Sequence, residues 1–219
     1  MKAKKVLPDR RSIRLQGYDY SNPGEYFVTI CTQNRECVFG DVVKHKMALN
    51  EIGDIARYYW YRIPERYDDV VIDAFVVMPN HVHGIIGIEY NPVRDAHSAG
   101  INKPDGANQS VGAIHELPLP EMPQRDNMSP PGVATDFETY RKQRRQMLLS
   151  KIIGWYKMNV AKRANMLLHN SGNRFWQRNY YEHIIRDEQS LNRIREYIVS
   201  NPERWDDDMN HPENINPKP

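Results

Sequence analysis

Apolar positions in the first sixty or so residues predict a strand, a second extended segment and a helix. The pattern over residues 26–32 is typical of a strand, and residues 37–43 fit a partner strand or a turn. Asn50 is a good N-cap, and the helical period that follows predicts a helix running to about Arg62. The inner face of this helix should carry Ile52, Ile55 and Tyr59.

The most apolar part of the chain predicts two buried strands in succession. The first covers Val70–Val77 and the second includes Ile85–Ile88. Pro79–Asn80 separates them, because proline and asparagine favour turns over continued strand. We therefore expect a hairpin whose strands lie in the core.

The second half of the chain predicts a long helix, a short strand and an amphipathic helix. Residues 137–168 are expected to form a long basic helix, and residues 181–185 a strand. Asp187 should cap a helix over residues 188–200, which stops at Asn201–Pro202 because proline restricts the residue before it. The apolar stripe of this last helix consists of Leu191, Ile194 and Ile198.

Strands interspersed with helices, without regular βα alternation, predict an α+β fold. The 219 residues suffice for one domain with a real core. Residues 91–135 are rich in Pro, Gly, Asn and Ser, and they predict a long, largely disordered insertion. We therefore expect a basic arm at 1–18, one domain at 19–205 interrupted by this insertion, and a tail at 206–219.

Two histidines lie two residues apart inside the second predicted strand. Side chains alternate between the faces of a strand, so His81 and His83 leave one face while Val82 leaves the other. Two neutral imidazoles on one face can occupy two corners of a divalent metal site and leave other positions for substrate oxygens. The alternatives are a pair of ordinary strand histidines or half of a structural zinc site.

Tyr197 and Asn201 lie four residues apart at the end of the last predicted helix. They are neighbours on one flank of its apolar stripe. A phenol with a pKa of about 10 is a weak nucleophile until a cation or a base favours its ionised form. If Tyr197 and Asn201 face the histidine pair, they place a nucleophile beside the expected metal site. The alternatives are a half-buried edge residue and a plain helix cap.

Positive charge is concentrated in one region, although the formal net charge is only +2. Residues 140–181 hold ten Lys or Arg and no Asp or Glu. Basic side chains interleaved with aromatic ones suit phosphates and stacked bases, so we expect nucleic-acid binding over the alternative of a solvated helix face. The residues expected to bind DNA are Arg141, Lys142, Arg144, Arg145, Lys151, Lys157, Arg174 and Arg178.

Three segments together resemble one family of transposases. They are Met78–Gly84 (MPNHVHG), Phe175–Arg186 (FWQRNYYEHIIR) and Arg195–Pro202 (REYIVSNP). This combination is similar to the REP-associated tyrosine transposases among the single-tyrosine HUH transposases, over about residues 19–205 outside the insertion. The resemblance implies the HUH endonuclease/transposase (ferredoxin-like) fold, an antiparallel β-sheet with helices packed on one face.

The resemblance also implies an activity. It implies a metal-dependent endonuclease and strand transferase that acts in DNA transposition on single-stranded DNA at hairpin, or palindromic, sites. Tyr197 matches the nucleophile, which attacks a backbone phosphorus and leaves a 5′-phosphotyrosine and a free 3′-hydroxyl. His81, His83 and Asn201 match the metal ligands, with Mg²⁺ or Mn²⁺ as the cofactor. Other HUH transposases carry Gln at the position of Asn201. Relatives include monomers and homodimers.

Two other functions fit the same residues. The chain could be an inactive or domesticated protein that binds DNA hairpins through its basic helix, or a metal protein in which His81 and His83 serve only stability. The joint presence of both histidines with Tyr197 and Asn201 favours the enzyme. No apolar run approaches the ~20 residues needed to span a bilayer, so we expect a cytoplasmic protein without membrane contact.

Overall fold

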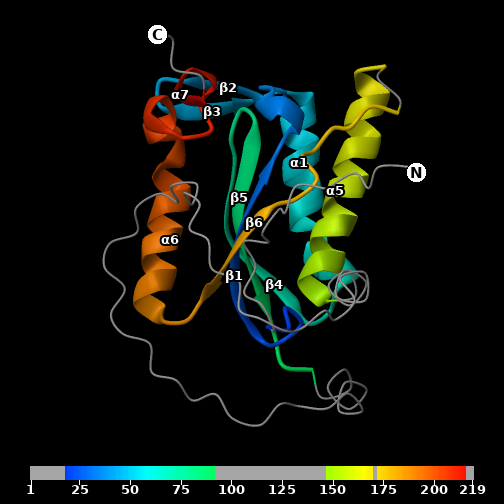
Figure 1. The fold of residues 1–219 in the computed structure, drawn as a ribbon, viewed down its shortest axis with the longest axis vertical. Helices are drawn as coiled ribbons and strands as arrows, with labels where there is room; N and C mark the ends of the chain where they lie inside the picture. The colour runs from blue at the N-terminus through cyan, green and yellow to red at the C-terminus, as the bar shows by residue number, and fades with distance from the viewer. Residues whose placement is uncertain (1–17, 92–146, 170–171, 216–219) are drawn as a thin grey trace, which may run out of the picture.

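The computed structural model describes residues 18–91, 147–169 and 172–215. Within these ranges, four antiparallel strands form a sheet of order β4-β5-β1-β6 (Figure 1). Its strands are β1 (Gly24–Cys31), β4 (Val70–Val77), β5 (His81–Ile88) and β6 (Tyr181–Ile185). A separate ribbon at one end consists of β2 (Gly40–Val43) and β3 (Lys46–Leu49). The predicted α+β architecture with an antiparallel sheet is confirmed.

Helices cover both faces of the sheet, which corrects the expectation that they would pack on one face. The helices α1 (Glu51–Tyr61) and α5 (Leu148–Leu167) lie on one side, and α6 (Glu188–Ser200) lies on the other (Figure 1). The reason is the composition of the two central strands, whose apolar side chains alternate to both faces. Shorter elements are η1 (Gln33–Arg35), α2 (Ile63–Arg66), η2 (Asn201–Asp207) and α7 (Pro212–Ile215).

The two predicted central strands and the last helix form where the sequence indicated. Strand β5 is buried at every position, and its first residue is His81. Helix α6 has its predicted bounds, and the Asp187 side chain accepts a hydrogen bond from Ser190 N at 2.7 Å. The positions of these strands and the helix cap therefore follow local sequence signals.

Helix α1 begins after Asn50 as predicted, and of its three predicted inner residues Ile52 is buried. The Asn50 side chain accepts hydrogen bonds from the backbone N–H groups of Ile52 and Gly53, both at 3.0 Å. Trp60 is fully buried, whereas the predicted inner residues Ile55 and Tyr59 are half-buried. The large indole ring fixes which side of the helix faces the sheet.

Strand β3 and helix α2 were not expected from the sequence. Strand β3 pairs with β2 across a turn at Lys44 and His45, which have φ angles of 50° and 60°. Hairpin turns of this kind usually carry Asn or Gly at such positions, and this turn has neither. The missing turn residues explain why only an extended segment or turn was predicted there.

One prediction falls partly, and another largely, outside the described residues. The basic helix predicted over 137–168 is described from Leu148 onward, and the insertion predicted over 91–135 lies beyond the described ranges from residue 92. Among the helices that the structure does describe, none combines the length and the apolar character needed to cross a lipid bilayer.

Gly84 on the central strand β5 lies against the Trp60 side chain of helix α1. A Cβ atom built on Gly84 would lie 2.2 Å from Cζ2 of Trp60. The indole cannot retreat easily, because its other face stacks on Phe75 with ring centroids 4.4 Å apart and planes 9° apart. Gly84 is therefore required by packing.

We expect Gly84→Ala to lower the free energy of unfolding by about 1–3 kcal/mol, the usual cost of overpacking a core. The matched control is Gly154→Ala in α5, where an added Cβ would meet nothing within 4 Å. This control should be neutral or stabilise by up to about 1 kcal/mol through helix propensity. Urea unfolding of both variants measures the difference, and equal stabilities would contradict the packing argument.

Candidate active site

Strand β5 delivers two imidazoles to the face of the sheet that α6 covers. His81 and His83 are buried, with exposed fractions of 0% and 2%. In the register with β1, Cys31 is the partner of His81 and Thr29 is the partner of His83. The Phe27 ring stacks on His83 with centroids 5.4 Å apart. The alternation expected from the sequence thus brings both rings to one face.

The two rings face each other through their Nε2 atoms, which are 2.9 Å apart. Each Nδ1 atom has a separate hydrogen-bond partner: Asn80 Oδ1 for His81 at 2.8 Å, and Thr29 Oγ1 for His83 at 2.8 Å. Such partners fix ring orientation and are typical of histidines that bind a metal through the other nitrogen. Neither Asn80 nor Thr29 was predicted from the sequence to be a site residue.

Helix α6 brings Tyr197 to the histidine pair. Its hydroxyl oxygen lies 3.4 Å from His83 Nε2, and the centroids of the two rings are 5.2 Å apart. The Phe27 ring meets Tyr197 edge to face at 6.1 Å. The helix is held on this face by an apolar cluster of Phe27, Ile85, Ile185, Leu191, Ile194 and Ile198.

Asn201 lies at the end of α6, 2% exposed. Burial, and then the Asp208 carboxylate, raise the pKa of Tyr197 above its ordinary value, and the hydrogen-bonding capacity of the Asn201 side chain acts on it in the opposite direction. Within the described ranges, Asn201 Oδ1 is buried without a hydrogen-bond partner. The role of Asn201 as a metal ligand stays a prediction.

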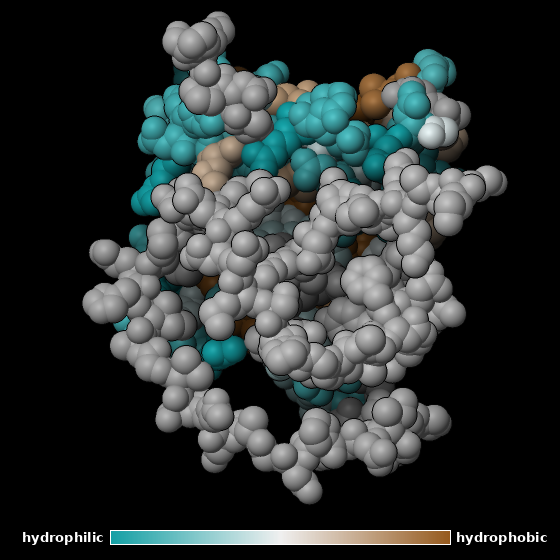
Figure 2. Space-filling model, viewed as in Figure 1, coloured by the Kyte–Doolittle hydropathy of each residue, from teal (hydrophilic) through white to brown (hydrophobic). Residues whose placement is uncertain are grey.

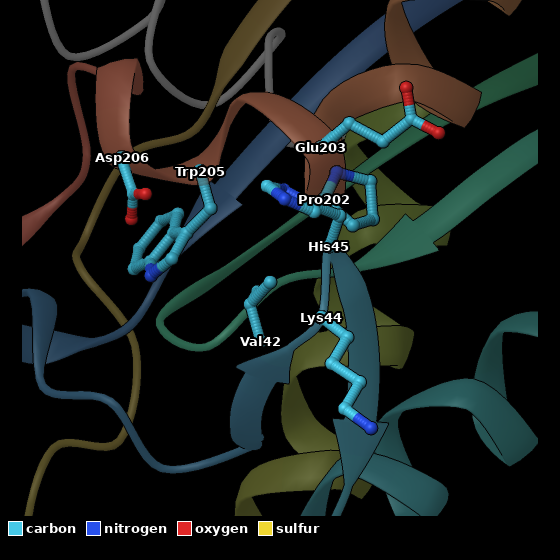
Figure 3. Close-up of a pocket in the computed structure, with 7 residues that line it drawn as sticks. All are labelled: Val42, Lys44, His45, Pro202, Glu203, Trp205 and Asp206. Atoms are coloured by element: carbon cyan, nitrogen blue, oxygen red, sulfur yellow. The ribbon is translucent and has the colours of Figure 1, made fainter.

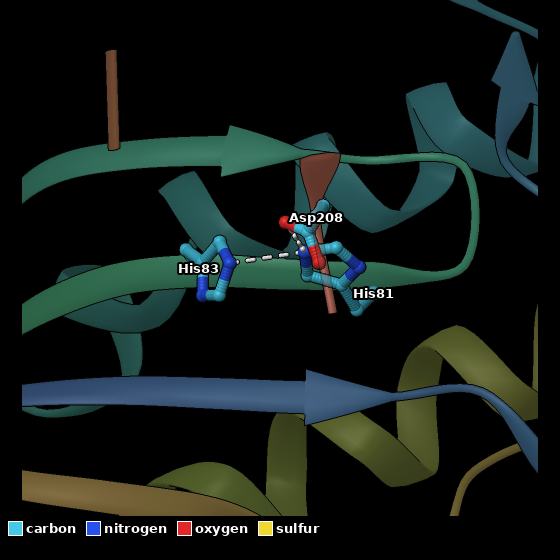
Figure 4. Close-up of side chains that lie close together, drawn as sticks. All are labelled: His81, His83 and Asp208. Atoms are coloured by element: carbon cyan, nitrogen blue, oxygen red, sulfur yellow. Dashed lines mark hydrogen bonds and ion pairs between the residues drawn. The ribbon is translucent and has the colours of Figure 1, made fainter. Parts of the chain in front are cut away.

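Asp208 is a candidate site residue that sequence reasoning missed. It follows η2, is 6% exposed, and its Oδ2 atom lies 3.8 Å from His81 Nε2 (Figure 4). One ligand atom from each of His81, His83 and Asp208 lies within 4.8 Å of the others. Asp208 falls in the segment expected to be a tail, and the run Asp206-Asp207-Asp208 gives no sign of which carboxylate is buried.

Burial keeps both imidazoles neutral near neutral pH. It lowers the pKa of His81 to about 3, with a further contribution from the positive charge of Arg35. The pKa of His83 is also well below its ordinary value, because of burial and the neighbouring His81, although Asp208 acts in the opposite direction. Neutral rings have a free lone pair, which metal binding requires.

These groups fit a divalent cation. The carboxylate of Asp208 is buried. Within the described ranges, the one side chain at ion-pair distance from it is His81, which is neutral. A buried carboxylate without a cation is costly, and a bound ion would remove that cost. Two imidazole nitrogens and a carboxylate oxygen are donors that many divalent ions accept. His81, His83 and Asp208 could therefore hold a metal ion.

The chain after α6 covers the histidines from the solvent side. The Trp205 ring is 8% exposed, and its centroid lies 6.0 Å from that of His81. Beyond it, the carbonyl oxygen of Asn210 accepts a hydrogen bond from Asn80 Nδ2 at 2.7 Å. Figure 2 shows that the described surface at this end of the molecule is mainly hydrophilic.

Two further contacts support this covering segment. Arg35 Nη1 donates a hydrogen bond to the carbonyl of Met209 at 3.0 Å. On the outer side, the turn of the β2–β3 ribbon lies against η2 and encloses a small pocket of about 150 Å³ (Figure 3). This pocket is lined by Val42, Lys44, His45, Pro202, Glu203, Trp205 and Asp206.

The basic residues predicted to bind DNA have different environments. Lys151, Arg174 and Arg178 are exposed. The Lys157 ammonium donates hydrogen bonds to two backbone carbonyls, those of Gln177 at 2.6 Å and Arg178 at 3.3 Å. The other four predicted residues lie outside the described ranges: Arg141, Lys142, Arg144 and Arg145.

No protein-family model matches the chain. Among solved structures, it is similar to a REP-associated tyrosine transposase bound to a REP hairpin, with 15% sequence identity and a TM-score of 0.42. The match covers 89% of this chain and 74% of that chain. A similarity of this size assigns no function.

A Haemophilus influenzae protein, described as an uncharacterized protein, is 36% identical over 206 residues. The alignment covers 91% of this chain and 92% of the relative. With this identity over nearly the whole of both chains, the protein belongs to the same family as its Haemophilus influenzae relative.

Proposed function

We propose that the protein is a metal-dependent transposase that nicks and rejoins single-stranded DNA at hairpin sites through a 5′-phosphotyrosine. The observation that carries this proposal is the 3.4 Å approach of the Tyr197 hydroxyl to His83 Nε2, which joins two residues 114 positions apart. A phenol beside a pair of metal-competent imidazoles suits nucleophilic attack on a phosphodiester.

Each residue has a definite task in this reaction. Tyr197 Oη forms a bond to phosphorus and loses its proton, while the bond from phosphorus to the 3′-oxygen breaks and that oxygen takes up a proton. Asn201 lies four residues after Tyr197 at the end of α6, and its side chain would favour the phenolate by hydrogen bonding. Religation is the reverse attack, in which a DNA hydroxyl attacks the phosphotyrosine. It needs no ATP, because the phosphotyrosine conserves the energy of the broken phosphodiester bond.

His81, His83 and Asp208 would hold Mg²⁺ or Mn²⁺, and Asn201 Oδ1 remains the predicted further donor. When bound, the ion supplies positive charge that neutralises the attacked phosphate. The protein's own contribution is to keep both imidazoles neutral and their Nε2 atoms facing one point.

Substrate entry requires a change in the covering segment. His81 and His83 are 0% and 2% exposed, so a phosphodiester reaches them only after the Trp205 ring, which lies against His81, moves. Exposed Lys151, Arg174 and Arg178 are then candidates for contact with the DNA backbone. That the protein acts as a homodimer is part of the same proposal.

A second candidate function is hairpin binding without cleavage. Two observations favour it: the histidine pair is closed to solvent, and burial makes the Tyr197 phenolate harder to form, because it raises the pKa of Tyr197. Cleavage assays separate the two functions directly.

We expect Tyr197→Phe to abolish the covalent protein–DNA adduct while hairpin affinity stays within a few-fold. The phenylalanine ring keeps the packing against Phe27 and removes only the nucleophilic oxygen. Denaturing gels of the protein with Mn²⁺ and hairpin-bearing single-stranded DNA detect the adduct. Tyr58→Phe, an exposed tyrosine on α1, is the matched control and should cleave normally. Adduct formation by Tyr197→Phe would disprove the assignment.

The metal ligands can be ranked by substitution. We expect His81→Ala, His83→Ala and Asp208→Asn each to weaken Mn²⁺ binding by more than about ten-fold, since each removes a donor. Asn201→Ala should weaken it less, because a neutral amide oxygen is readily replaced by water. Free Mn²⁺ measured by electron paramagnetic resonance gives the affinities. A larger loss with Asn201→Ala than with Asp208→Asn would reverse the proposed ranking.

The metal-free protein should lose stability as the pH falls below about 6.5. The unfolded chain then takes up protons on both rings, whereas the lowered pKa values keep the folded rings neutral. The stabilisation is therefore present above pH 6.5 and is lost toward lower pH, by roughly 1 kcal/mol per pH unit for each histidine. In urea unfolding experiments in EDTA, the free energy of unfolding should fall less steeply with decreasing pH for His83→Gln than for the wild type. The same dependence on pH in both proteins would contradict the burial argument.

A further inference from the structure

The edge strand β4 contains a bulge halfway along its length. Its pairing with β5 shifts register between Ile72 and Phe75, so that two residues of β4 lie opposite a single residue of β5. The two residues are Asp73 and Ala74. A bulge of this kind adds one residue to one strand and changes the direction of the side chains that follow. The regular alternation of β4 is therefore broken at this point.

The bulge brings both of these residues to the face of the sheet that α6 covers. Ala74 packs against the apolar cluster that holds α6, whereas Ile72 and Phe75 pack against the core on the other face, where Phe75 stacks on Trp60. Residues three apart on a regular strand would lie on opposite faces. At the interruption, Asp73 Oδ1 accepts a hydrogen bond from the backbone N–H of Ala74 at 2.7 Å. One inserted residue thus directs the Asp73 carboxylate toward α6.

Arg195 of α6 binds this carboxylate with two of its nitrogens. Its Nε donates a hydrogen bond to Asp73 Oδ2 at 2.8 Å, and its Nη2 lies 2.7 Å from the same oxygen. The third nitrogen, Nη1, donates to Asn192 Oδ1 on the same helix at 2.9 Å. The side chains of Arg195 and Asp73 are 39% and 31% exposed, so the contact is partly shielded from water. The ion pair therefore joins α6 to the edge strand at one defined point.

Arg195 and Tyr197 lie on opposite flanks of α6. The buried stripe of this helix consists of Leu191, Ile194 and Ile198. At 3.6 residues per turn, Arg195 lies roughly 70° to one side of the centre of the stripe and Tyr197 roughly 90° to the other side. A rotation of the helix about its axis would therefore move both side chains at once. Apolar contacts are not directional, so the stripe alone sets this rotation only loosely.

We propose that the ion pair between Arg195 and Asp73 sets the rotation of α6 about its axis and thereby positions the Tyr197 hydroxyl beside the histidine pair. The hydroxyl lies 3.4 Å from His83 Nε2. A directional contact on one flank of the helix fixes the rotation that the apolar stripe leaves open, and the other flank follows. Arg195 and Asp73 act through Tyr197, so they are positioning residues. This inference rests on the proposed function, in which Tyr197 is the nucleophile.

The chain offers a matched control for this ion pair. Arg57 Nη2 lies 2.7 Å from Asp54 Oδ1, but both residues belong to α1 and their side chains are 56% and 55% exposed. This second pair therefore connects no two elements of the fold. Exposed ion pairs add little to stability, so unfolding experiments alone would not separate the two pairs. The rate of adduct formation and the position of the Tyr197 ring should separate them.

Arg195→Ala and Asp73→Asn test the proposal by adduct formation with hairpin-bearing single-stranded DNA and Mn²⁺. Asp73→Asn keeps an oxygen for the Ala74 N–H and removes only the charge. We expect each variant to form the adduct about ten-fold more slowly, because a small displacement of a nucleophile is costly, while hairpin affinity stays within about two-fold of wild type. Arg57→Ala should form the adduct at the wild-type rate.

The double variant of Arg195→Ala and Asp73→Asn should be no slower than the slower single variant, because both changes break the same interaction. Wild-type rates in both single variants would overturn the proposal. Additive losses in the double variant would do so as well, and so would a ten-fold loss of hairpin affinity in Arg195→Ala, which would make Arg195 a DNA contact.

The ring of Tyr197 gives a readout that needs no cleavage. It meets the Phe27 ring of β1 edge to face, with centroids 6.1 Å apart. Nuclear Overhauser effects between the protons of these two rings therefore report the rotation of α6. They should weaken in Arg195→Ala and stay at wild-type strength in Arg57→Ala. Wild-type strength in Arg195→Ala would overturn the proposal.

Failure of the proposed function has a different signature. If the wild-type protein forms no adduct, Tyr197 is not the nucleophile under these conditions and the proposed function fails, whereas the ring contact still decides whether the ion pair sets the rotation of α6. If the wild-type protein forms the adduct and Arg195→Ala keeps both its rate and its ring contact, the proposed function stands and only the positioning role of Arg195 and Asp73 fails.

Discussion

The burial of strand β5 on both faces is the constraint on which the described structure depends. Every residue of this strand is buried, so each of its faces must be matched by a complementary layer. On one face, Gly84 leaves room for the indole of Trp60, and this contact brings α1 close to the sheet. On the other face, His81 and His83 replace apolar side chains, and α6 covers them. A polar site inside a core is tolerable only where each polar atom has a partner.

For the two histidines, the structure meets this condition with one partner from a neighbouring strand and one from the adjacent turn. Thr29 comes from the neighbouring strand and Asn80 from the turn before β5, and both bind Nδ1 atoms. Their contacts leave the two Nε2 atoms directed at each other and at Asp208. The same burial that lowers the pKa of both imidazoles raises the pKa of Tyr197. One physical cause therefore keeps the proposed metal ligands neutral and makes the proposed nucleophile harder to ionise.

Local sequence signals were sufficient for much of the architecture. Alternation placed His81 and His83 on one face, and Asp187 marked the start of α6 because a cap is a local interaction. What the sequence could not supply depended on contacts across the fold. The burial of Asp208 is decided by how η2 turns back over β5, and the partnership of Thr29 with His83 is decided by strand register. The second helical layer was also missed, because apolar runs do not show which face each helix covers.

The histidine pair and the two ends of the segment 92–146 lie at opposite ends of the sheet. Residues 92–146 connect the end of β5 to the start of α5, where Ile88 pairs with Gly24 and Leu149 N donates to the carbonyl of Tyr20. His81, by contrast, pairs with Cys31 at the other end of β5, roughly 20 Å away at the usual rise of a strand. The connection is therefore a natural place to graft a foreign module, such as a fluorescent reporter or a sequence-reading DNA-binding domain, without disturbing the histidines.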